Sequence, residues 1–364
     1  MHDEPASLAS RLRQRAHAAI AAAGGWWPFD RFMALALYEP GLGYYSRSDR
    51  MFGQLPGSGS DFVTAPEMSP LFGATLAVQV AQALDATGTH EVWEFGAGSG
   101  ALAQQLLTAL GERVRRYVIV DLSGALQARQ RERLAAYGDR VVWVSALPDA
   151  LQGVVVGNEV LDAMPVQLLH FDGQQWFERG VASRGEVFSW ADRPTDLRPP
   201  LAEGMVPGTV TEIHPQAQAF MRTLAATLTR GAVFLIDYGF PEAEYYLPQR
   251  HGGTLMCHRA HRADPDPLVD LGDKDITAHV DFTAIALAGQ DAGLQVLGYT
   301  SQARFLFNCG FADRLAAADL PTRSAAQRLV NEHEMGELFK VIGFVQGPWF
   351  DAIGFAEGDR SHRL

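Results

Sequence analysis

The sequence predicts an α/β fold with a doubly wound, mostly parallel sheet, and three observations support this prediction. Short β-branched segments recur along the chain, of the kind that parallel sheets bury on both faces. Between residues 91 and 165 helical sequence separates these segments, so strands and helices alternate. Glycines at positions 96, 98 and 100 directly follow the first strand, where such sheets place a ligand-binding turn.

The composition is that of a globular protein. The chain has 364 residues, 47% of them hydrophobic, enough for one large decorated domain or two domains. The 42 acidic and 30 basic residues give a net charge of −12, and no Lys/Arg-rich segment occurs, so we expect no nucleic-acid binding. No apolar stretch approaches the roughly 18 residues that span a bilayer, so we expect no membrane insertion. Cys257 and Cys309 are too few for a disulfide scaffold, and we expect a cytoplasmic location.

Residues 1–90 form the first predicted unit, a segment of helices and loops. An amphipathic helix over residues 7–23 ends at a pair of glycines. A long stretch punctuated by glycines follows it. Ser69 and Pro70 then provide the N-cap and the first position of a helix that runs to about Asp85.

Residues 91–364 form the second predicted unit, the sheet with its inserts. Its strands are predicted at residues 91–95, 117–120, 141–144, 154–156, 232–237, 293–299 and 339–346. Its helices are predicted at residues 100–110, around 126–134, after 215 and at about 312–334. Two inserts interrupt this pattern: antiparallel hairpins at about 166–210, and a polar Gly/Pro/His-rich lid or insert at 241–277.

The turn after the first strand is the most informative segment. Its glycines, within residues 96–100, let a ligand approach the backbone, and the next helix presents unpaired N–H groups. Asp121 ends the second strand, where a carboxylate can bind both hydroxyls of a ribose. The glycines alone also fit a dinucleotide fold, but Glu94 would then lie beside an anionic pyrophosphate. The two acids favour S-adenosylmethionine (SAM), which carries a cationic amine and a sulfonium; a dinucleotide and an unliganded turn are the alternatives.

A second polar turn follows the fourth strand and contains Asn158, Glu159 and Asp162. The carboxyl ends of strands line the ligand crevice of an open α/β sheet, so this turn should face the reacting group. Two carboxylates can clamp a planar guanidinium through bidentate hydrogen bonds. Alternatively, Asn158 or Asp162 caps the start of a helix. Glu212 is a further acidic candidate for the site.

Two weaker groups of residues are also open to interpretation. Cys257, His258 and His261 lack the spacing of a four-ligand zinc site, so we expect no bound metal. Tyr44 and Tyr45 either line a substrate groove or belong to the core.

Taken together, these motifs resemble the MidA-like family of class I SAM-dependent methyltransferases, relatives of a mitochondrial complex I assembly factor that methylates arginine. The resemblance covers most of the chain, in order. It is carried by YEPGLGYY (38–45), DFVTAPE (61–67), SPLFG (69–73), EFGAGSG (94–100), NEVLDAMP (158–165), EIHP (212–215), DYG (237–239) and FKV (339–341).

The resemblance implies a seven-stranded, Rossmann-like SAM fold in which residues 61–69 cover the cofactor. It implies methylation of an arginine in a partner protein of the respiratory complex I subunit type, with Glu159, Asp162 and Glu212 as catalytic residues. It also implies that SAM is bound by Thr64, Pro66, Glu67, Glu94, Gly96, Ala97, Gly98, Ser99, Asp121, Leu122 and Asn158.

Other activities stay open from the sequence. The same cofactor site would serve a methyltransferase that acts on a small molecule or on another protein residue. A catalytically weak assembly chaperone that binds SAM is the non-enzymatic alternative. A homodimer is one open form of assembly.

Overall fold

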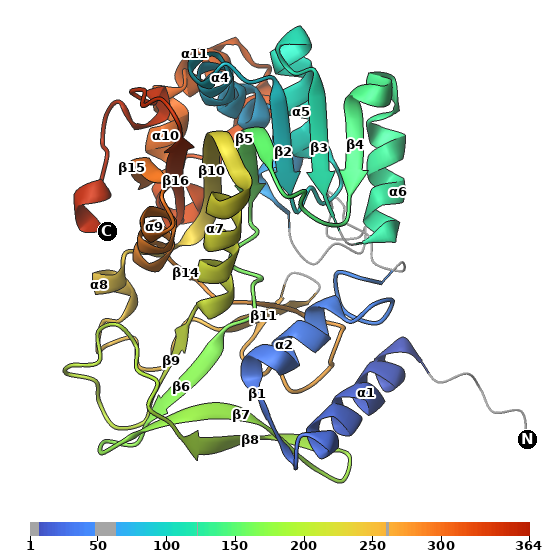
Figure 1. Ribbon diagram of the computed structural model, residues 1–364, viewed down its shortest axis with the longest axis vertical. Helices are drawn as coiled ribbons and strands as arrows, with labels where there is room; N and C mark the ends of the chain where they lie inside the picture. The colour runs from blue at the N-terminus through green and yellow to red at the C-terminus, as the bar shows by residue number, and fades with distance from the viewer. Residues whose placement is uncertain (1–6, 48–62, 122, 260–261) are drawn as a thin grey trace, which may run out of the picture.

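The computed structural model describes residues 7–47, 63–121, 123–259 and 262–364 (Figure 1). Within these residues the central sheet has the strand order β15-β16-β10-β5-β2-β3-β4, and β14 pairs with β10. Its strands are β2 (Glu91–Phe95), β3 (Arg116–Val120), β4 (Val141–Val144), β5 (Leu151–Asn158), β10 (Leu228–Phe240), β14 (Val280–Asp281), β15 (Gln295–Ser301) and β16 (Phe339–Gln346). The strands from β4 to β10 are parallel, whereas β16 is antiparallel to β10 and β15. The predicted doubly wound α/β fold is confirmed.

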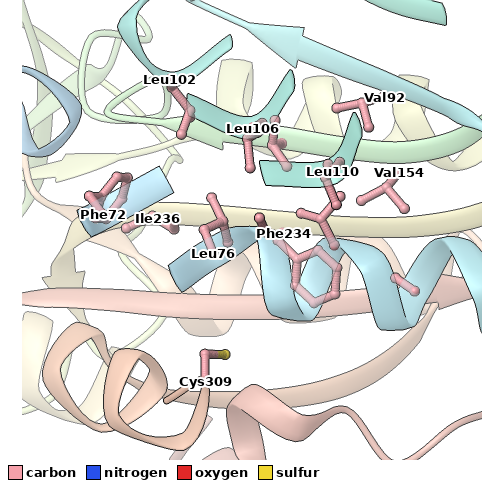
Figure 2. Packing of buried hydrophobic residues seen from close by; sticks show 14 of the residues in the cluster. Phe72, Leu76, Val92, Leu102, Leu106, Leu110, Val154, Phe234, Ile236 and Cys309 are labelled. Carbon is pink, nitrogen blue, oxygen red and sulfur yellow. The ribbon is translucent and has the colours of Figure 1, made fainter. Parts of the chain in front are cut away.

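Helices cover both faces of this sheet, and alternate residues of each strand enter two different cores. In β5, Val154 and Val156 join one core and Val155 the other. On the first face, α4 (Pro70–Thr87) and α5 (Ala101–Leu110) pack against the sheet through Phe72, Leu76, Leu102 and Leu106 (Figure 2). On the second face lie α7 (Pro215–Thr227) and α9 (Phe282–Asp291). This two-sided burial explains why the strands are largely apolar and why several of them, such as β3 and β5, are rich in valine and isoleucine.

Local chemistry sets the ends of the helix that precedes β2. The Ser69 side chain accepts a hydrogen bond from the Leu71 N–H at 3.2 Å, and Pro70 occupies the first turn. Gly88 ends α4 in the left-handed conformation with a φ of 62°. The remaining helices of the sheet domain are α6 (Gly124–Arg133), α10 (Gln302–Asn308), α11 (Phe311–Ala317) and α12 (Leu320–Gln327). No helix in the described ranges is both long and apolar enough to cross a membrane.

A second, antiparallel sheet contains the predicted hairpins. It comprises β1 (Trp26–Pro28), β6 (Gln167–Phe171), β7 (Trp176–Arg184), β8 (Val187–Pro194) and β9 (Thr209–Ile213). Figure 1 shows this sheet below the central one, with two N-terminal helices beside it. β9 extends the region to Ile213, beyond the predicted end at about 210, because it pairs with β6 along its whole length. β1, which was not predicted from the sequence, joins this sheet through β7.

The N-terminal helices α1 (Leu8–Ala22) and α2 (Phe29–Tyr38) pack on this second sheet. Leu12 and Phe32 share a core with Val181 and Phe188. The predicted helix at 7–23 is confirmed, and Ser7 caps it. Much of the segment before residue 47 therefore supports the second sheet.

The polar segment at 241–277 is an ordered insert. It contains α8 (Glu242–Tyr245) and a small sheet of β11 (Met256–Arg259), β12 (Arg262–Asp264) and β13 (Asp275–Thr277). Cys257 and Ile276 enter the same core as α1 and α2. The insert is thereby attached to the N-terminal segment, which brings β13 close to the carboxyl end of the central sheet.

Candidate active site

A cavity of about 470 Å³ lies at the carboxyl ends of β2, β3, β4 and β5. The volume is within the usual range of small-molecule sites. Its lining contains the predicted residues Thr64, Pro66, Glu67, Glu94, Gly96, Ala97, Gly98, Ser99, Asp121, Asn158 and Glu159. Leu122, Asp61 and Phe62 lie outside the described residues. Segments far apart in the sequence thus meet where the sequence analysis expected a cofactor.

The glycine-rich turn after β2 forms one wall of the cavity. Gly96 and Gly98 have φ values of 62° and 52°, in the left-handed region that a side chain makes costly. Among the described residues, apart from its two chain neighbours, no atom lies within 4 Å of the position that a Cβ on Gly98 would take. The backbone of this turn is therefore open to a bound molecule.

The short helix α3 (Ala65–Met68) is tied to this turn by charged groups. Ser99 Oγ donates a hydrogen bond to Glu67 Oε1. Arg133 Nη1, on α6, lies 3.1 Å from the same carboxylate oxygen and 2.7 Å from Ser99 Oγ. The observed contacts of Glu67 position α3 and Pro66 against the glycine turn, which is a structural role beside the cofactor.

Glu94 lies at the floor of the cavity and is buried. Its Oε2 accepts a hydrogen bond from the Tyr117 hydroxyl at 2.6 Å. Burial raises the pKa of Glu94 to about 8, although the hydrogen bond from Tyr117 lowers it. A cationic ligand beside Glu94 would favour the ionised carboxylate. Tyr117 was not predicted as a site residue, because it is one residue of an apolar strand.

Asp121 lies across the glycine turn from Glu94. Its Oδ1 accepts from the Ser123 N–H, and its Oδ2 accepts from Gln130 Nε2, each at 2.8 Å. Gln130 also donates to the Gly98 carbonyl at 2.9 Å, so it links the two halves of the site. A carboxylate has about four acceptor positions, which leaves capacity for ribose hydroxyls. Burial raises the pKa of Asp121, and the bonds from Ser123 and Gln130 oppose that rise.

The turn after β5 holds Glu159 in a strained backbone conformation. Its φ of 55° is unusual for a residue with a side chain and costs of order 1–3 kcal/mol. Asp237 Oδ2 accepts from the backbone N–H groups of Val160, Leu161 and Asp162 at 2.9–3.3 Å. The Glu159 N–H donates to the Ile236 carbonyl at 2.9 Å. The end of β10 therefore fixes the turn that carries Glu159.

Burial is the main reason that the carboxylates of this turn have raised pKa values. For Glu159 the pKa rises to about 8, with Asp162 as the next cause. For Asp162 it rises to about 6, opposed by a hydrogen bond from the Tyr238 hydroxyl. Asp162 does not line the cavity; its side chain is buried beside Tyr238. No helix begins between residues 158 and 166, so the alternative of a helix cap is wrong.

The structure does not bring Glu212, predicted as a catalytic residue, together with the other predicted site residues. The Glu212 side chain is fully buried in the second sheet and does not reach the cavity. Oε1 accepts from the N–H groups of Thr254 and Leu255 at 2.8 and 3.0 Å, and Oε2 accepts from the Tyr245 hydroxyl at 2.9 Å. An acid three residues before a proline looked like a site residue, but it anchors the backbone of the insert.

No group of three or more potential metal ligands occurs within the described ranges, which exclude His261. Cys257 is buried in the core with α1 and α2, away from the cavity. Tyr44 belongs to the same core, whereas Tyr45 lines the cavity. Tyr44 is therefore a core residue, whereas a contact of Tyr45 with a substrate stays a prediction.

Three residues that were not predicted as site residues shape the site: Tyr38 and Asp237, which belong to the motifs quoted above, and Asp275, which the sequence did not indicate. Tyr38 ends α2 and lines the cavity, and its hydroxyl donates to the Ala163 carbonyl at 2.8 Å. Asp275 lies on β13 and accepts from the Tyr45 hydroxyl at 2.7 Å. Asp237 at the end of a strand was a signal for a site or a turn, but nothing near Asp275 in the sequence resembles a motif.

These residues fit SAM. The open backbone at Gly98 accommodates a ligand without a displaced side chain. Asn158 lines the cavity, and its Oδ1 is a buried acceptor without a hydrogen-bond partner in the described part of the chain. Glu94 and Asp121 supply carboxylates for a cationic amine and for ribose hydroxyls. These acceptor groups thus match a ligand that brings its own N–H and O–H groups.

Comparison with known proteins agrees with this assignment. A structure from Burkholderia thailandensis, described as a COG1565 superfamily member bound to S-adenosyl-homocysteine (SAH), is 53% identical, with a TM-score of 0.94 over 99% of both chains. A native structure of a COG1565 protein from the same organism is 52% identical, with a TM-score of 0.89 and the same coverage.

Curated relatives are more distant. The protein arginine methyltransferase NDUFAF7 of Homo sapiens is 27% identical, and the match covers 86% of this chain and 79% of that protein. The homologue in Caenorhabditis elegans is 26% identical over 78% of this chain and 73% of that protein. The profile of a family described as S-adenosyl-L-methionine-dependent methyltransferases matches residues 75–300. The chain therefore belongs to this family of methyltransferases, with SAM as its cofactor.

Proposed function

We propose that this methyltransferase transfers a methyl group to a guanidinium nitrogen of an arginine in a partner protein. The observation that carries the proposal is the turn after β5. It presents the Glu159 carboxylate and the Asn158 amide to the same cavity that contains Glu94, Asp121 and the glycine turn. The printed names of the curated relatives, protein arginine methyltransferases, support the same acceptor.

Glu159 has the properties that a guanidinium acceptor requires. A guanidinium is protonated at all ordinary pH values and is a poor nucleophile. Glu159 Oε1 already accepts from Asn158 Nδ2 at 2.9 Å, which orients the carboxylate. Ionised Glu159 would hold the N–H groups of the guanidinium and concentrate electron density on its nitrogens. SAM, when bound, supplies an electrophilic methyl group on its sulfonium.

Methylation of a guanidinium also releases one proton, because a new N–C bond replaces one N–H bond. The pKa of Glu159 is about 8 in the ligand-free protein, and a bound guanidinium would favour its ionised form, which can accept this proton near neutral pH. Asp237, through the N–H groups of residues 160–162, keeps this carboxylate in place. A rigid turn matters since the displacement takes place at the methyl carbon, with sulfur as the leaving group, and requires an in-line approach of the nucleophile.

The identity of the partner protein and the location of the enzyme in the cell are proposals as well. A target of the respiratory complex I subunit type follows only from the resemblance in sequence. A cytoplasmic location and a homodimer are likewise proposals that rest on sequence reasoning.

The test is a transfer assay with isotopically labelled SAM and the soluble proteins of a cell extract. After acid hydrolysis, label in methylarginine is the expected result for the wild-type chain, and Glu159→Gln should give none. Label in another amino acid, or only in the small-molecule fraction, would contradict the proposal and favour one of the alternative acceptors.

A further inference from the structure

The short helix α3 contacts both halves of the active site. Pro66 and Glu67 line the cavity, which also contains the glycine turn and Glu159. At the first residue of α3, the backbone N–H of Ala65 donates a hydrogen bond to the Glu159 carboxylate. Near the other end of α3, Glu67 accepts a hydrogen bond from Ser99 Oγ in the glycine turn. This helix therefore connects the turn after β2 with the turn after β5.

The backbone of α3 is a single hydrogen-bonded turn. The N–H groups of Glu67 and Met68 donate to the Thr64 carbonyl at 3.0 and 3.1 Å, and the Ser69 N–H donates to the Ala65 carbonyl at 3.4 Å. Because these bonds link the start of the turn to its end, the turn moves as one unit. A displacement of Glu67 therefore also displaces the Ala65 N–H.

Arg133 on α6 joins the contact between Glu67 and Ser99. Its Nη1 lies 3.1 Å from Glu67 Oε1 and 2.7 Å from Ser99 Oγ. The exposed fraction is 32% for the Arg133 side chain and 12% for that of Glu67. A charge-assisted contact that is largely shielded from water is stronger than an ion pair in open solvent. Arg133 does not line the cavity, so it acts on the reaction only through α3 or the glycine turn.

A second support of α3 comes from α5. Gln105 Nε2 donates to the Pro66 carbonyl at 2.7 Å, and Gln105 Oε1 accepts from the Gly73 N–H at 2.9 Å. This support keeps the middle of α3 in place when the charged contact is lost. Removal of the Arg133 guanidinium should therefore loosen α3 without unfolding it.

The Glu159 carboxylate receives hydrogen bonds from two sides. Asn158 Nδ2 donates to its Oε1 at 2.9 Å, and the Ala65 N–H is the donor from α3. Three further carboxylates face Glu159 and oppose its ionisation: Asp162 on the same turn, Asp237 on β10 and Asp275 on β13. Donors to the ionised form counteract this repulsion, so the position of the Ala65 N–H affects both the orientation and the charge of Glu159.

We propose that Arg133 is a positioning residue for methyl transfer, because it fixes the contact between Glu67 and Ser99 and thereby holds α3 against the glycine turn. In that position the Ala65 N–H meets the Glu159 carboxylate. Glu159 is then correctly placed only while α3 is seated on the turn that receives SAM. This inference rests on the proposed function, which assigns Glu159 the contact with the acceptor, and extends it to a residue outside the cavity.

The experiment measures the ionisation of Glu159 without turnover. Full-length protein is labelled with carbon-13 at the glutamate carboxyl groups, and the NMR signal that is absent from Glu159→Gln identifies Glu159. In the ligand-free wild-type protein this signal should titrate with a midpoint at about pH 8. In Arg133→Met the midpoint should rise by about 0.5 pH units or more, because a hydrogen bond to the ionised form is weakened. Arg133→Lys keeps the positive charge, so its midpoint should stay closer to that of the wild type.

Arg131→Met is the matched control on the same helix. The Arg131 guanidinium lies over the Trp143 ring, 4.1 Å from its centroid, so this variant should titrate like the wild type. Ser99→Ala removes the hydroxyl donor to Glu67 and should also raise the midpoint. It provides the test if Arg133→Met does not fold. In the transfer assay, turnover should fall about tenfold in Arg133→Met and stay unchanged in Arg131→Met, since a misplaced carboxylate lowers the rate.

The outcomes for the two proposals are distinct. A wild-type midpoint in both Arg133→Met and Ser99→Ala would overturn the role of Arg133, as would an equal rise in Arg131→Met. Absence of methylarginine in the transfer assay would refute the proposed reaction, and the titration of Glu159, measured without turnover, would still decide whether Arg133 positions it.

Discussion

Replacing Glu159 by glutamine should stabilise the ligand-free protein at high pH while it abolishes methyl transfer. Burial and the nearby Asp162 raise the pKa of Glu159 from 4.5 to about 8. The folded protein therefore binds more protons at this site than the unfolded chain between these pH values. It follows that the free energy of unfolding decreases as the pH rises through this window. Glutamine cannot ionise, so the variant escapes this loss.

The magnitude follows from the same pKa values. Each unit of difference in pKa between the folded and the unfolded chain is worth about 1.4 kcal/mol. A difference of about 3.5 therefore sets an upper value of about 5 kcal/mol on the loss in free energy of unfolding. Glu159 borders an open cavity, and screening by water reduces the expected loss to about 2 kcal/mol. Most of this loss should develop between about pH 4.5 and about pH 8.

Urea unfolding at these two pH values measures the loss in the wild-type protein and in Glu159→Gln. The fully exposed Glu112 provides the control, since Glu112→Gln should follow the wild-type protein at both pH values. Turnover of Glu159→Gln should fall by about 100-fold or more, with SAH affinity within about threefold of wild type. An identical pH dependence in Glu159→Gln and wild type would refute the argument from burial. Full turnover would refute the catalytic role.

Three further substitutions test the site and its supports. Asp237→Ala removes the acceptor for three backbone N–H groups, and we expect a loss of about 3 kcal/mol in urea unfolding together with a loss of turnover. Destabilisation with normal turnover per folded molecule would contradict that role. Asp121→Ala should weaken SAH binding by about tenfold or more in calorimetry, because hydroxyl acceptors are lost; unchanged affinity would remove Asp121 from the site. Glu212→Ala should lower stability by about 3 kcal/mol, since the N–H groups of Thr254 and Leu255 lose their partner, and it should leave SAH affinity unchanged. Weakened SAH binding would show that Glu212 matters to the cavity after all.

The cofactor half of the site was predictable because its residues are close in sequence to the strands that position them. Glu94 and the glycine turn belong to one strand–turn–helix unit, and Asp121 ends the neighbouring strand. The carboxyl ends of adjacent parallel strands meet at one edge, so local patterns suffice to place these groups together. Asn158 and Glu159 were found by the same reasoning, after the next strand.

The positions of acidic residues outside these turns were not predictable in the same way. Glu212 is three residues before the start of α7 and looked functional, yet the pairing of β9 with β6 places it in the second sheet. Asp275 looked like part of a polar lid, yet the attachment of β13 to the N-terminal core brings it to Tyr45. Both outcomes depend on contacts between segments far apart in the chain.

The sequence by itself determined the sheet, its helices and the chemistry of the turns, because hydrophobic periodicity and glycine positions act over a few residues. Only the tertiary structure decided which polar groups share the cavity and which lie buried elsewhere. Tyr38 and Tyr45 reach the site only because α2 packs on the second sheet, and Asp237 supports Glu159 only because β10 lies beside β5. The physical reason is that burial and hydrogen bonding at the site arise from long-range packing, which no local pattern encodes.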